Sequence, residues 1–440
     1  MEIRLQGPEP VESSIESMAR SRHFLFLQGP CGRFYSHLQR SLEAEGHRCT
    51  RVAINGGDLI GGLFDGIHLY RRSFADWPQW LLALVQRGGI TDLICYGDCR
   101  PYHRAAITAL QPLGVTVHVL EEGYLRPNWV TCEKDGVNGN SALTRINLDA
   151  IDEVSVAESG ASPEIEVKGT QWHYMLSGFV HYLCTLLLTP LFPRYQTHRD
   201  LDIAGEGALW IERFITWPLR KSRTARNLKA IARRGRPIHL ALLQLNADSQ
   251  LREHSSFQSS RHFAEFCIAE FAASGSPDAV LVFKNHPLDN GVINLARVIR
   301  EEAEKHKLSE RVFFIDSGKL VPLLEKAISV TAINSTAVHQ ALLRGIPTMV
   351  LGKAVFNHPQ IVPRMRLGDF FRMRPHKGDD GYRKLVSLMR QTSQYNGGFY
   401  SAHARQALLP SLTKALIDGA PEPASFERQA SPHRPALKVS

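Results

Sequence analysis

Three groups of polar residues in this chain follow apolar, β-branched runs, at places where strands are expected to end. In chain order they are Glu121-Glu122, Asn285-His286-Pro287 and Asn334-Ser335-Thr336. In open α/β sheets, ligands bind outside the carboxyl ends of the strands. A carboxylate, an imidazole and a hydroxyl pair in such equivalent places predict one active site between two half-sheets.

The glutamate pair is the first candidate for chemistry. Glu121 and Glu122 follow the strand-like run 115–120, and Gly123 comes directly after them. Two carboxylates this close repel each other and raise the pKa of one of them. Such a pair is therefore costly unless it serves a purpose. If the strand continues, the two side chains point to opposite faces. One can then act as nucleophile or general base while the other holds a neighbour. The alternative is a turn closed by a salt bridge, with Arg126 as the partner.

The other two groups can bind or protonate a phosphate. His286 can hydrogen-bond a phosphate or give a proton to a departing one, and Pro287 fixes the backbone beyond it. Ser335 and Thr336 precede a helical pattern, 337–343. They are ordinary helix caps, or they hold an anion, because free N–H groups and the helix dipole attract negative charge there.

A glycine-rich turn follows the first expected strand, 23–27. It runs Gln28-Gly29-Pro30-Cys31-Gly32 and matches neither the dinucleotide fingerprint nor a Walker loop. The glycines either let the backbone approach a sugar or phosphate closely or simply form a tight turn.

Alternating strand-like and helical patterns predict an α/β fold. The alternation runs from residue 23 to about residue 141 and resumes from 237 to 351, which predicts two parallel, doubly wound sheets. Two such Rossmann-like domains facing each other form a glycosyltransferase-B-like architecture. The expected divisions are 1–145 for the N-terminal domain with Glu122, 146–236 for a loop and helical membrane-contact or linker region, 237–395 for the C-terminal domain, and 396–440 for a C-terminal helix and flexible tail.

The insertion between the two domains is apolar first and basic afterwards. Residues 172–192 are rich in Leu, Tyr, Phe and Trp, and from Arg213 to Arg236 there are nine Lys and Arg with no acid. An apolar helix followed by a basic one suits the surface of an anionic membrane. Nucleic acid would also accept the charge, and the simplest alternative is a helical linker with a solvated basic face.

Composition indicates a folded chain. With 440 residues, 43% hydrophobic and 22% charged, the chain is long enough for two domains. No secretory signal and no apolar run of about 20 residues are visible. The seven cysteines are odd in number and scattered. Cys95 and Cys99 form the one close pair, which does not complete a zinc site. Reduced thiols in a cytoplasmic protein are expected.

Taken together, the motifs resemble those of the bacterial capsule polysaccharide synthesis proteins. The residues that carry the resemblance are Leu27-Gln28-Gly29-Pro30-x-Gly32-x-Phe34, Asn55-Gly56-Gly57-Asp58, Tyr96-Gly97-Asp98-Cys99-Arg100-Pro101, Glu121-Glu122-Gly123-Tyr124-Leu125-Arg126-Pro127, Lys284-Asn285-His286-Pro287-Leu288-Asp289-Asn290-Gly291 and Asn334-Ser335-Thr336. The likeness covers about residues 20–390 and is greatest to the KpsS/LipB branch, the β-Kdo transferases that start the lipid-linked capsule linker. The order of the motifs is also similar to that of bacterial sialyltransferases, which use CMP-linked donors.

The resemblance implies a retaining enzyme of capsular polysaccharide biosynthesis, cytoplasmic and peripherally attached to the inner face of the cytoplasmic membrane. It implies CMP-β-Kdo as donor, a (lyso)phosphatidylglycerol-type lipid as acceptor, other capsule assembly and export proteins as partners, and no nucleic acid. No metal or cofactor is expected, because a nucleoside monophosphate leaving group carries less charge than a diphosphate. The alternatives are a transferase for another CMP-sugar, such as sialic acid, and a non-catalytic scaffold of the assembly and export complex.

The resemblance also implies roles for individual residues. In relatives the second acidic residue of the first motif is catalytic and often Asp, so Glu122 is the expected nucleophile and Glu121 its support. His286 would stabilise or protonate the departing CMP phosphate. The expected CMP and phosphate ligands in the C-terminal domain are Ser335, Thr336, Asn334 and Lys284. The expected donor and acceptor contacts are Gln28, Gly29, Gly32, Asp98, Arg126 and Asp248, with Arg126 or Lys284 pairing with the Kdo carboxylate.

Overall fold

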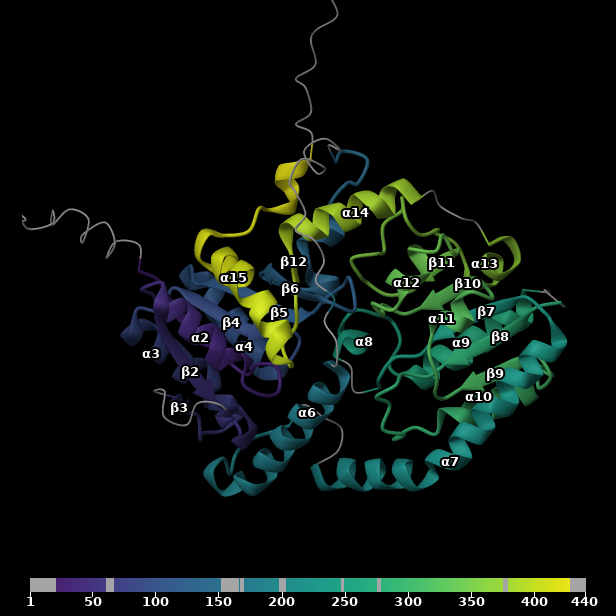
Figure 1. Ribbon diagram of the computed structural model, residues 1–440, viewed down its shortest axis with the longest axis horizontal. Helices are drawn as coiled ribbons and strands as arrows, with labels where there is room; N and C mark the ends of the chain where they lie inside the picture. Colours follow the sequence, from purple (N-terminus) through teal and green to yellow (C-terminus); the bar gives the residue numbers. More distant parts are fainter. Residues whose placement is uncertain are drawn as a thin grey trace, which may run out of the picture. The chain divides into compact units, whose positions relative to one another are not determined.

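The computed structural model describes residues 21–60, 67–151, 166, 170–197, 203–246, 249–274, 278–374 and 379–427 (Figure 1). Its contacts divide the chain into two compact units, and neither is a continuous stretch. The first unit is 1–121, 165–197 and 396–419, and the second is 122–164, 198–395 and 420–440. This division differs from the contiguous ranges expected above, because it falls between Glu121 and Glu122 and gives the C-terminal helix to the first unit.

The first sheet has the order β12-β6-β5-β4-β1-β2-β3. Its strands are β1 (His23–Phe26), β2 (Arg48–Ala53), β3 (Ile67–Leu69), β4 (Asp92–Tyr96), β5 (Thr116–Glu122), β6 (Trp129–Lys134) and β12 (Gln394–Asn396). The pairings of β1 with β2 and β4, of β2 with β3 and of β4 with β5 are parallel. The strand order reverses between β1 and β4, which makes that position the topological switch point. Its helices are α2 (Phe34–Ala44), α3 (Trp77–Gly88), α4 (Pro101–Leu110), α6 (Thr170–Leu187) and α15 (Ala402–Asp418).

The second sheet is wholly parallel, with the order β11-β10-β7-β8-β9. Its strands are β7 (Ile238–Leu242), β8 (Val280–Lys284), β9 (Val312–Ile315), β10 (Ala327–Ala332) and β11 (Thr348–Val350). The order reverses between β7 and β10. The helices of this unit are α7 (Ile203–Arg234), α8 (Ser249–Glu253), α9 (Ser260–Ala273), α10 (Leu295–Lys305), α11 (Val321–Leu324), α12 (Val338–Leu342), α13 (Leu367–Met373) and α14 (Asp379–Thr392). The expected α/β class with two Rossmann-like sheets is confirmed.

The side chains of the second sheet alternate between two apolar cores, one on each face of the sheet. Leu240 and Val282 belong to one cluster, while Ala241 and Leu281, their neighbours in sequence, belong to the other. Successive residues of a strand point to opposite faces, so the continuous apolar runs of β7 and β8 cover both sides. Such runs are typical of parallel strands buried on both faces.

The motif Asn55-Gly56-Gly57-Asp58 forms a platform on which α6 packs. Asn55 and Asp58 close a capping box at the short 3-10 helix η1 (Gly56–Leu59). A Cβ at Gly56 would collide with the carbonyl oxygen of Cys184, and a Cβ at Gly57 would collide with the ring of His181. Both partners belong to α6, so the glycines permit close helix packing. This explains the motif without a ligand.

The close packing of η1 against α6 predicts that Gly56→Ala destabilises the protein. The new methyl group meets backbone rather than a flexible side chain, so a cost of about 1–3 kcal/mol in the free energy of unfolding is expected. Gly178→Ala in α6 is the matched control, because a Cβ there meets nothing within 4 Å and alanine favours a helix. Chemical denaturation of both variants measures the difference. Equal stability of the two would contradict the platform.

Several elements were not predicted from the sequence. These are β3, β6, β12, α13 and α14. In the tail after Gly419, which was expected to be flexible, residues 420–427 are described, and Glu427 forms an antiparallel bridge with Ile151. The loop expected at the start of the 146–236 region lies largely outside the described residues. Among the helices that are described, none is long and apolar enough to cross a membrane.

Candidate functional site

The switch point of the second sheet is held by a pair of amides. Gln244 follows β7 and Asn334 follows β10, and the Gln244 amide donates to Asn334 Oδ1 at 2.7 Å. The backbone N–H of Asn334 donates back to Gln244 Oε1 at 3.0 Å. The Asn334 amide also donates to the carbonyl of Gln250 at 2.8 Å. The buried Asn334 side chain therefore fixes the loops beside the expected ligand position.

Ser335 and Thr336 are partly exposed at this switch point. Ser335 Oγ accepts a hydrogen bond from the N–H of Ala337 at 3.3 Å. This bond closes the turn before the helix and is no helix cap, because the N-cap residue is Ala337 and no side chain caps that end. The helix that follows, α12, has only five residues, so the dipole argument for an anion site has little force. An anion here would depend on the two hydroxyl groups themselves.

His286 follows β8 and is neutral at physiological pH. Burial lowers the pKa of His286 to about 4, and the positive charges of Arg126 and Lys284 act in the same direction. Nδ1 accepts a hydrogen bond from the N–H of Leu288 at 3.2 Å. The ring proton is therefore on Nε2, which can donate to a ligand. The charge of Arg126 thus acts on His286, and both residues belong to the second unit.

Lys284 is turned into the protein. Its Nζ donates to the carbonyl of Asn285 at 2.8 Å, and burial lowers the pKa of the Lys284 ammonium, opposed by the charge of Asp316. Asn285 donates to Asp289 at 3.0 Å and to Asp316 at 2.9 Å, and its Oδ1 accepts from the N–H of His286 at 2.9 Å. The hydrogen bonds of Asn285 thus fix the backbone of the His-Pro turn relative to Asp289 and Asp316.

Glu121 and Glu122 are the last residues of β5 and are half-buried. Oε1 of Glu122 is sealed from solvent. The next residue must be glycine, because a Cβ at Gly123 would collide with the carbonyl of Trp129. The loop beyond is pinned by Gln394, whose Oε1 accepts from the N–H of Tyr124 at 2.9 Å. The Glu122 backbone is therefore rigidly placed at the end of the sheet.

The candidate residues near the N-terminus lie in the first unit. Gln28 donates to Asp58 at 3.1 Å and accepts from Arg100 at 3.0 Å, so it joins the loops after β1, β2 and β4. Asp98 is buried and accepts a contact from the Cys99 thiol at 3.2 Å. Of the two candidate glycines in the turn after β1, Gly29 packs against the Tyr35 ring and Gly32 has φ +109°. Asp248 lies outside the residues that the structure describes.

Seven of the predicted site residues belong to the second unit: Glu122, Arg126, Lys284, His286, Asn334, Ser335 and Thr336. Gln28, Gly29, Gly32, Asp98 and Glu121 belong to the first. Sequence reasoning missed Gln244 and Asp316, although each follows an apolar strand, as the recognised groups do. Within the described residues, no cluster of three or more His, Cys, Asp or Glu could hold a metal ion.

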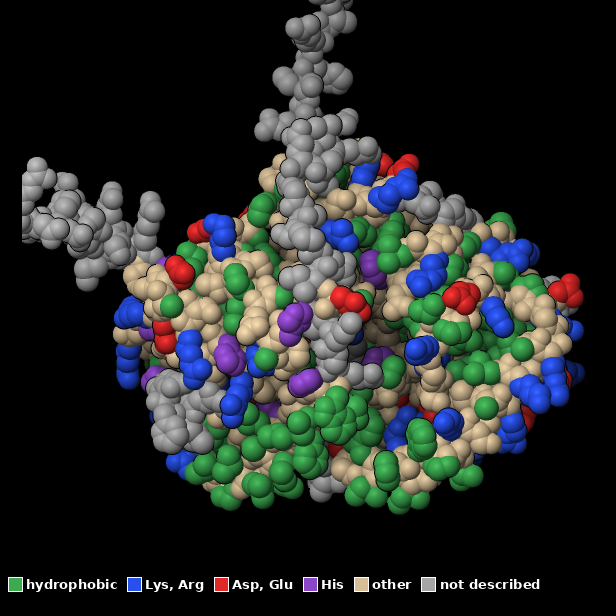
Figure 2. Space-filling model, viewed as in Figure 1, with side chains coloured by type: hydrophobic (Ala, Val, Ile, Leu, Met, Phe, Trp, Pro, Cys, Tyr) green, Lys and Arg blue, Asp and Glu red, His purple; other side chains and the backbone are tan. Residues whose placement is uncertain are grey.

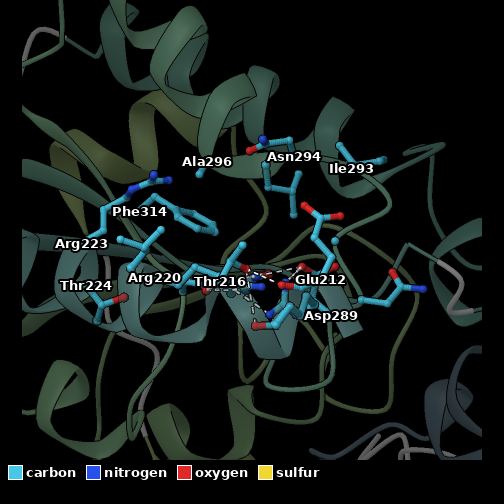
Figure 3. Close-up of a pocket in the computed structure, with 17 residues that line it drawn as sticks. Glu212, Thr216, Arg220, Arg223, Thr224, Asp289, Ile293, Asn294, Ala296 and Phe314 are labelled. Atoms are coloured by element: carbon cyan, nitrogen blue, oxygen red, sulfur yellow. Dashed lines mark hydrogen bonds and ion pairs between the residues drawn. The ribbon is translucent and has the colours of Figure 1, made fainter. Parts of the chain in front are cut away.

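Part of the basic segment expected to face a membrane is turned inward instead. Arg213 contacts Asp289 at 3.2 Å and Asp316 at 3.6 Å, and Arg220 is paired with Asp316. These residues and Asn285 line a cavity of about 240 Å³ beside α7. Figure 3 shows the lining residues, with Arg220 and Asp289 among those labelled. Burial would raise the pKa of Asp316, but the hydrogen bond from Asn285 and the charge of Arg220 outweigh it, so the pKa is lowered.

Because Asp316 joins α7 to the loop after β8, Asp316→Asn should strongly destabilise the second unit. Removing one partner of a largely buried ion pair leaves charge uncompensated and costs about 3 kcal/mol. Asp380→Asn is the control, because the Asp380 side chain is 79% exposed in its pair with Arg383 and exposed pairs contribute about 0–1 kcal/mol. Urea denaturation compares the two variants, and losses of equal size would contradict the assignment.

A model of the family described as "Capsule polysaccharide biosynthesis protein" matches residues 91–400. The chain belongs to this family. The matched range includes Glu122, His286 and Asn334 but not the glycine-rich turn. The family resemblance expected from the motifs is confirmed, and capsule polysaccharide biosynthesis is the process in which the family takes part.

Individual relatives agree with this assignment. The capsule polysaccharide export protein KpsS of Escherichia coli is 27% identical over 394 residues, which cover 88% of this chain and 99% of the relative. The capsule polysaccharide modification protein LipB of Neisseria meningitidis serogroup B is 27% identical over 402 residues, covering 89% and 95%. Among solved structures, the β-Kdo 2,7 transferase KpsC of Thermosulfurimonas dismutans has a TM-score of 0.44 and 12% identity, covering 90% of this chain and 99% of that chain.

Proposed function

We propose that the protein is a glycosyltransferase that moves Kdo from CMP-β-Kdo to a (lyso)phosphatidylglycerol-type lipid, with retention of configuration, and so starts the poly-Kdo linker. The observation that carries the proposal is the place of His286 just after β8, where the charge of Arg126 acts on it, in the sheet whose switch point is followed by Ser335 and Thr336. Ligands of open α/β sheets bind at such a point. Family membership and the name of the KpsC neighbour support the sugar.

The CMP phosphate is proposed to sit against Ser335, Thr336 and His286. The hydroxyls supply donors, and neutral His286 donates through Nε2 rather than transferring a full proton to the leaving group. Asn334 and Lys284 are engaged by protein carbonyls and amides, so their proposed role is to position the phosphate ligands. The leaving group carries less charge than a diphosphate, and the proposal requires no metal or cofactor.

Glu122 is the proposed nucleophile. A carboxylate oxygen attacks the anomeric carbon of Kdo while the bond from that carbon to the phosphate oxygen breaks, and CMP leaves with the bonding electron pair. The acceptor hydroxyl then attacks the same anomeric carbon, its proton passes to water, and the bond from that carbon to the Glu122 oxygen breaks to release the carboxylate. Two inversions give net retention. Glu121 is the proposed support, and Arg126, which is exposed, is better placed than Lys284 to pair with the Kdo carboxylate.

The loops of the first unit provide the remaining proposed contacts. Gln28 and Asp98 follow β1 and β4, on either side of the switch point of the first sheet. The turn with Gly29 and Gly32 lies beside them. We assign these residues to the donor sugar or the acceptor, together with Asp248.

Replacing Glu122 by Gln should abolish Kdo transfer while leaving CMP binding within about twofold. An amide of the same shape keeps the fold but cannot form the glycosyl-enzyme. Transfer to a fluorescent phosphatidylglycerol from CMP-Kdo measures activity, and calorimetry measures CMP binding. Glu121→Gln is the control and should retain measurable transfer.

Two other outcomes separate the alternatives. Turnover of CMP-sialic acid in place of CMP-Kdo would indicate the other donor class. If Glu122→Gln fully restores the capsule of cells that lack this protein, the protein is a non-catalytic scaffold of the assembly and export complex. Full transfer activity of the variant would refute the nucleophile.

Membrane contact is proposed for the exposed apolar faces of α6 and α7. On α6, Trp172 and Phe179 are 69% and 66% exposed, and on α7, Phe214 and Ile215 are 84% and 71% exposed. Figure 2 shows hydrophobic side chains gathered over each helix. Apolar and aromatic residues beside basic ones suit an anionic membrane surface. We infer a peripheral location on the cytoplasmic face, where capsule assembly and export proteins are the proposed partners.

Replacing Phe214, Ile215 and Trp217 together by Ser should weaken binding to anionic liposomes by at least tenfold, because three large side chains lose burial in the lipid interface. Sedimentation with vesicles containing phosphatidylglycerol measures the partition. Leu113→Ser, at an isolated leucine that is 49% exposed in the first unit, is the control and should bind as the wild type does. If the triple variant binds liposomes as the wild type does, the proposal that α7 contacts the membrane is wrong.

A further inference from the structure

The cavity beside α7 is formed by two parts of the second unit. On one side lie residues of α7, including Arg213, Thr216 and Arg223. On the other lie the loop after β8 and the start of α10, including Asn294 and Ala296. Its volume of about 240 Å³ is below the usual range for drug-sized ligands, ~300–1,000 Å³. A group smaller than a drug-sized ligand therefore suits it.

The floor of the cavity is electrically balanced. Arg213 and Arg220 are paired with Asp289 and Asp316, and Asn285 links both carboxylates. These four charges neutralise one another, so the floor itself attracts neither an anion nor a cation strongly. The amide and hydroxyl groups beside them, such as Asn294 and Thr216, can bond to hydroxyls of a ligand.

The two ends of the cavity carry opposite charges. Arg223 and Glu212 also line it, and Figure 3 shows them at different ends of the labelled group. Neither has an ion-pair partner among the described residues. Arg223 can take a phosphate, and Glu212, with Asn294 nearby, can accept hydrogen bonds from hydroxyls.

The outward face of the same helix is apolar. Phe214, Ile215 and Trp217 are exposed between the cavity-lining positions Arg213, Thr216 and Arg220. One helix thus separates a cavity that contains charged and amide groups from an exposed apolar surface. An amphiphile whose head enters the cavity and whose chains follow the outer face matches both.

We propose that this cavity binds the head group of the acceptor lipid, a phosphate-linked polyol, with the phosphate at Arg223 and the hydroxyls toward Asn294 and Glu212. The assignment rests on the proposed transferase function and adds the acceptor site to it. Asp289 and Asp316 offer an amine head group no free charge, because Arg213 and Arg220 neutralise them. Glu212 is the lining carboxylate left to attract an ammonium, so the ethanolamine head group is the competing ligand.

The test measures head-group binding without a membrane. Calorimetry with the full chain compares glycerophosphoglycerol, which has no acyl chains, with glycerophosphoethanolamine and inorganic phosphate. Glycerophosphoglycerol should bind at least fivefold more tightly than either. Arg223→Gln should weaken it about tenfold through loss of a charge-assisted hydrogen bond, and Ala296→Phe should abolish binding by filling the cavity.

Two controls accompany these variants. Arg226→Gln removes a charge from an exposed position of α7 that does not line the cavity, and Ala296→Ser changes little volume, so both should bind as the wild type does. Wild-type affinity of Ala296→Phe and Arg223→Gln would overturn the proposal, as would tighter binding of the ethanolamine compound.

Activity measurements separate this proposal from the transferase itself. If the wild type transfers Kdo but Ala296→Phe leaves the KM for the lipid unchanged, the cavity assignment fails while the function stands. If no transfer occurs but head-group binding follows the expected pattern, the transferase proposal fails and the cavity remains a head-group site.

Discussion

The second unit depends on the carboxylate of Asp316. It lies at the end of β9, receives a hydrogen bond from Asn285 and pairs with Arg213 and Arg220 of α7. Through Asn285 it fixes the backbone of His286, and through the arginines it fixes the helix that covers the cavity. A largely buried charge that has lost its partners is costly, so the site loop and α7 are stable only together.

The contacts of Asp316 connect the His-Pro turn with α7, and these two regions have different functional requirements. The His-Pro turn needs a fixed imidazole orientation to meet a phosphate, and α7 needs one face toward the protein to present the other outward. One carboxylate satisfies both requirements because Asn285 and the two arginines approach it from different elements. Substitution in the basic segment therefore has two separable effects: Arg220 acts on the fold, whereas exposed positions such as Arg226 act on the surface.

Strand ends were the part of the site that the sequence could reveal. Apolar runs followed by polar residues located Glu122 correctly at the end of β5 in the first sheet. They also placed His286 and Ser335 just after β8 and β10 of the second sheet, whose parallel strands gather their carboxyl ends at one edge. Gln244 and Asp316 also follow apolar runs, but neither belongs to a recognised motif, so they were not singled out. Short strands such as β12 lack a recognisable period, and the role of Gly56 depends on α6, more than 100 residues away, so neither could be read locally.

The neutral state of His286 constrains how the proposed leaving group is stabilised. Burial and two neighbouring cations keep the pKa of the imidazole near 4, so before the donor binds the ring cannot supply a proton at neutral pH. Negative charge on the departing phosphate must then be met by hydrogen bonds from Nε2, Ser335 and Thr336 and by the field of Arg126. The same cation that lowers the pKa of the empty site attracts the phosphate, and the bound phosphate in turn raises the pKa of His286. With Arg126 beside it, the proposed site binds the phosphate while His286 is neutral, and His286 becomes easier to protonate only after the phosphate has bound.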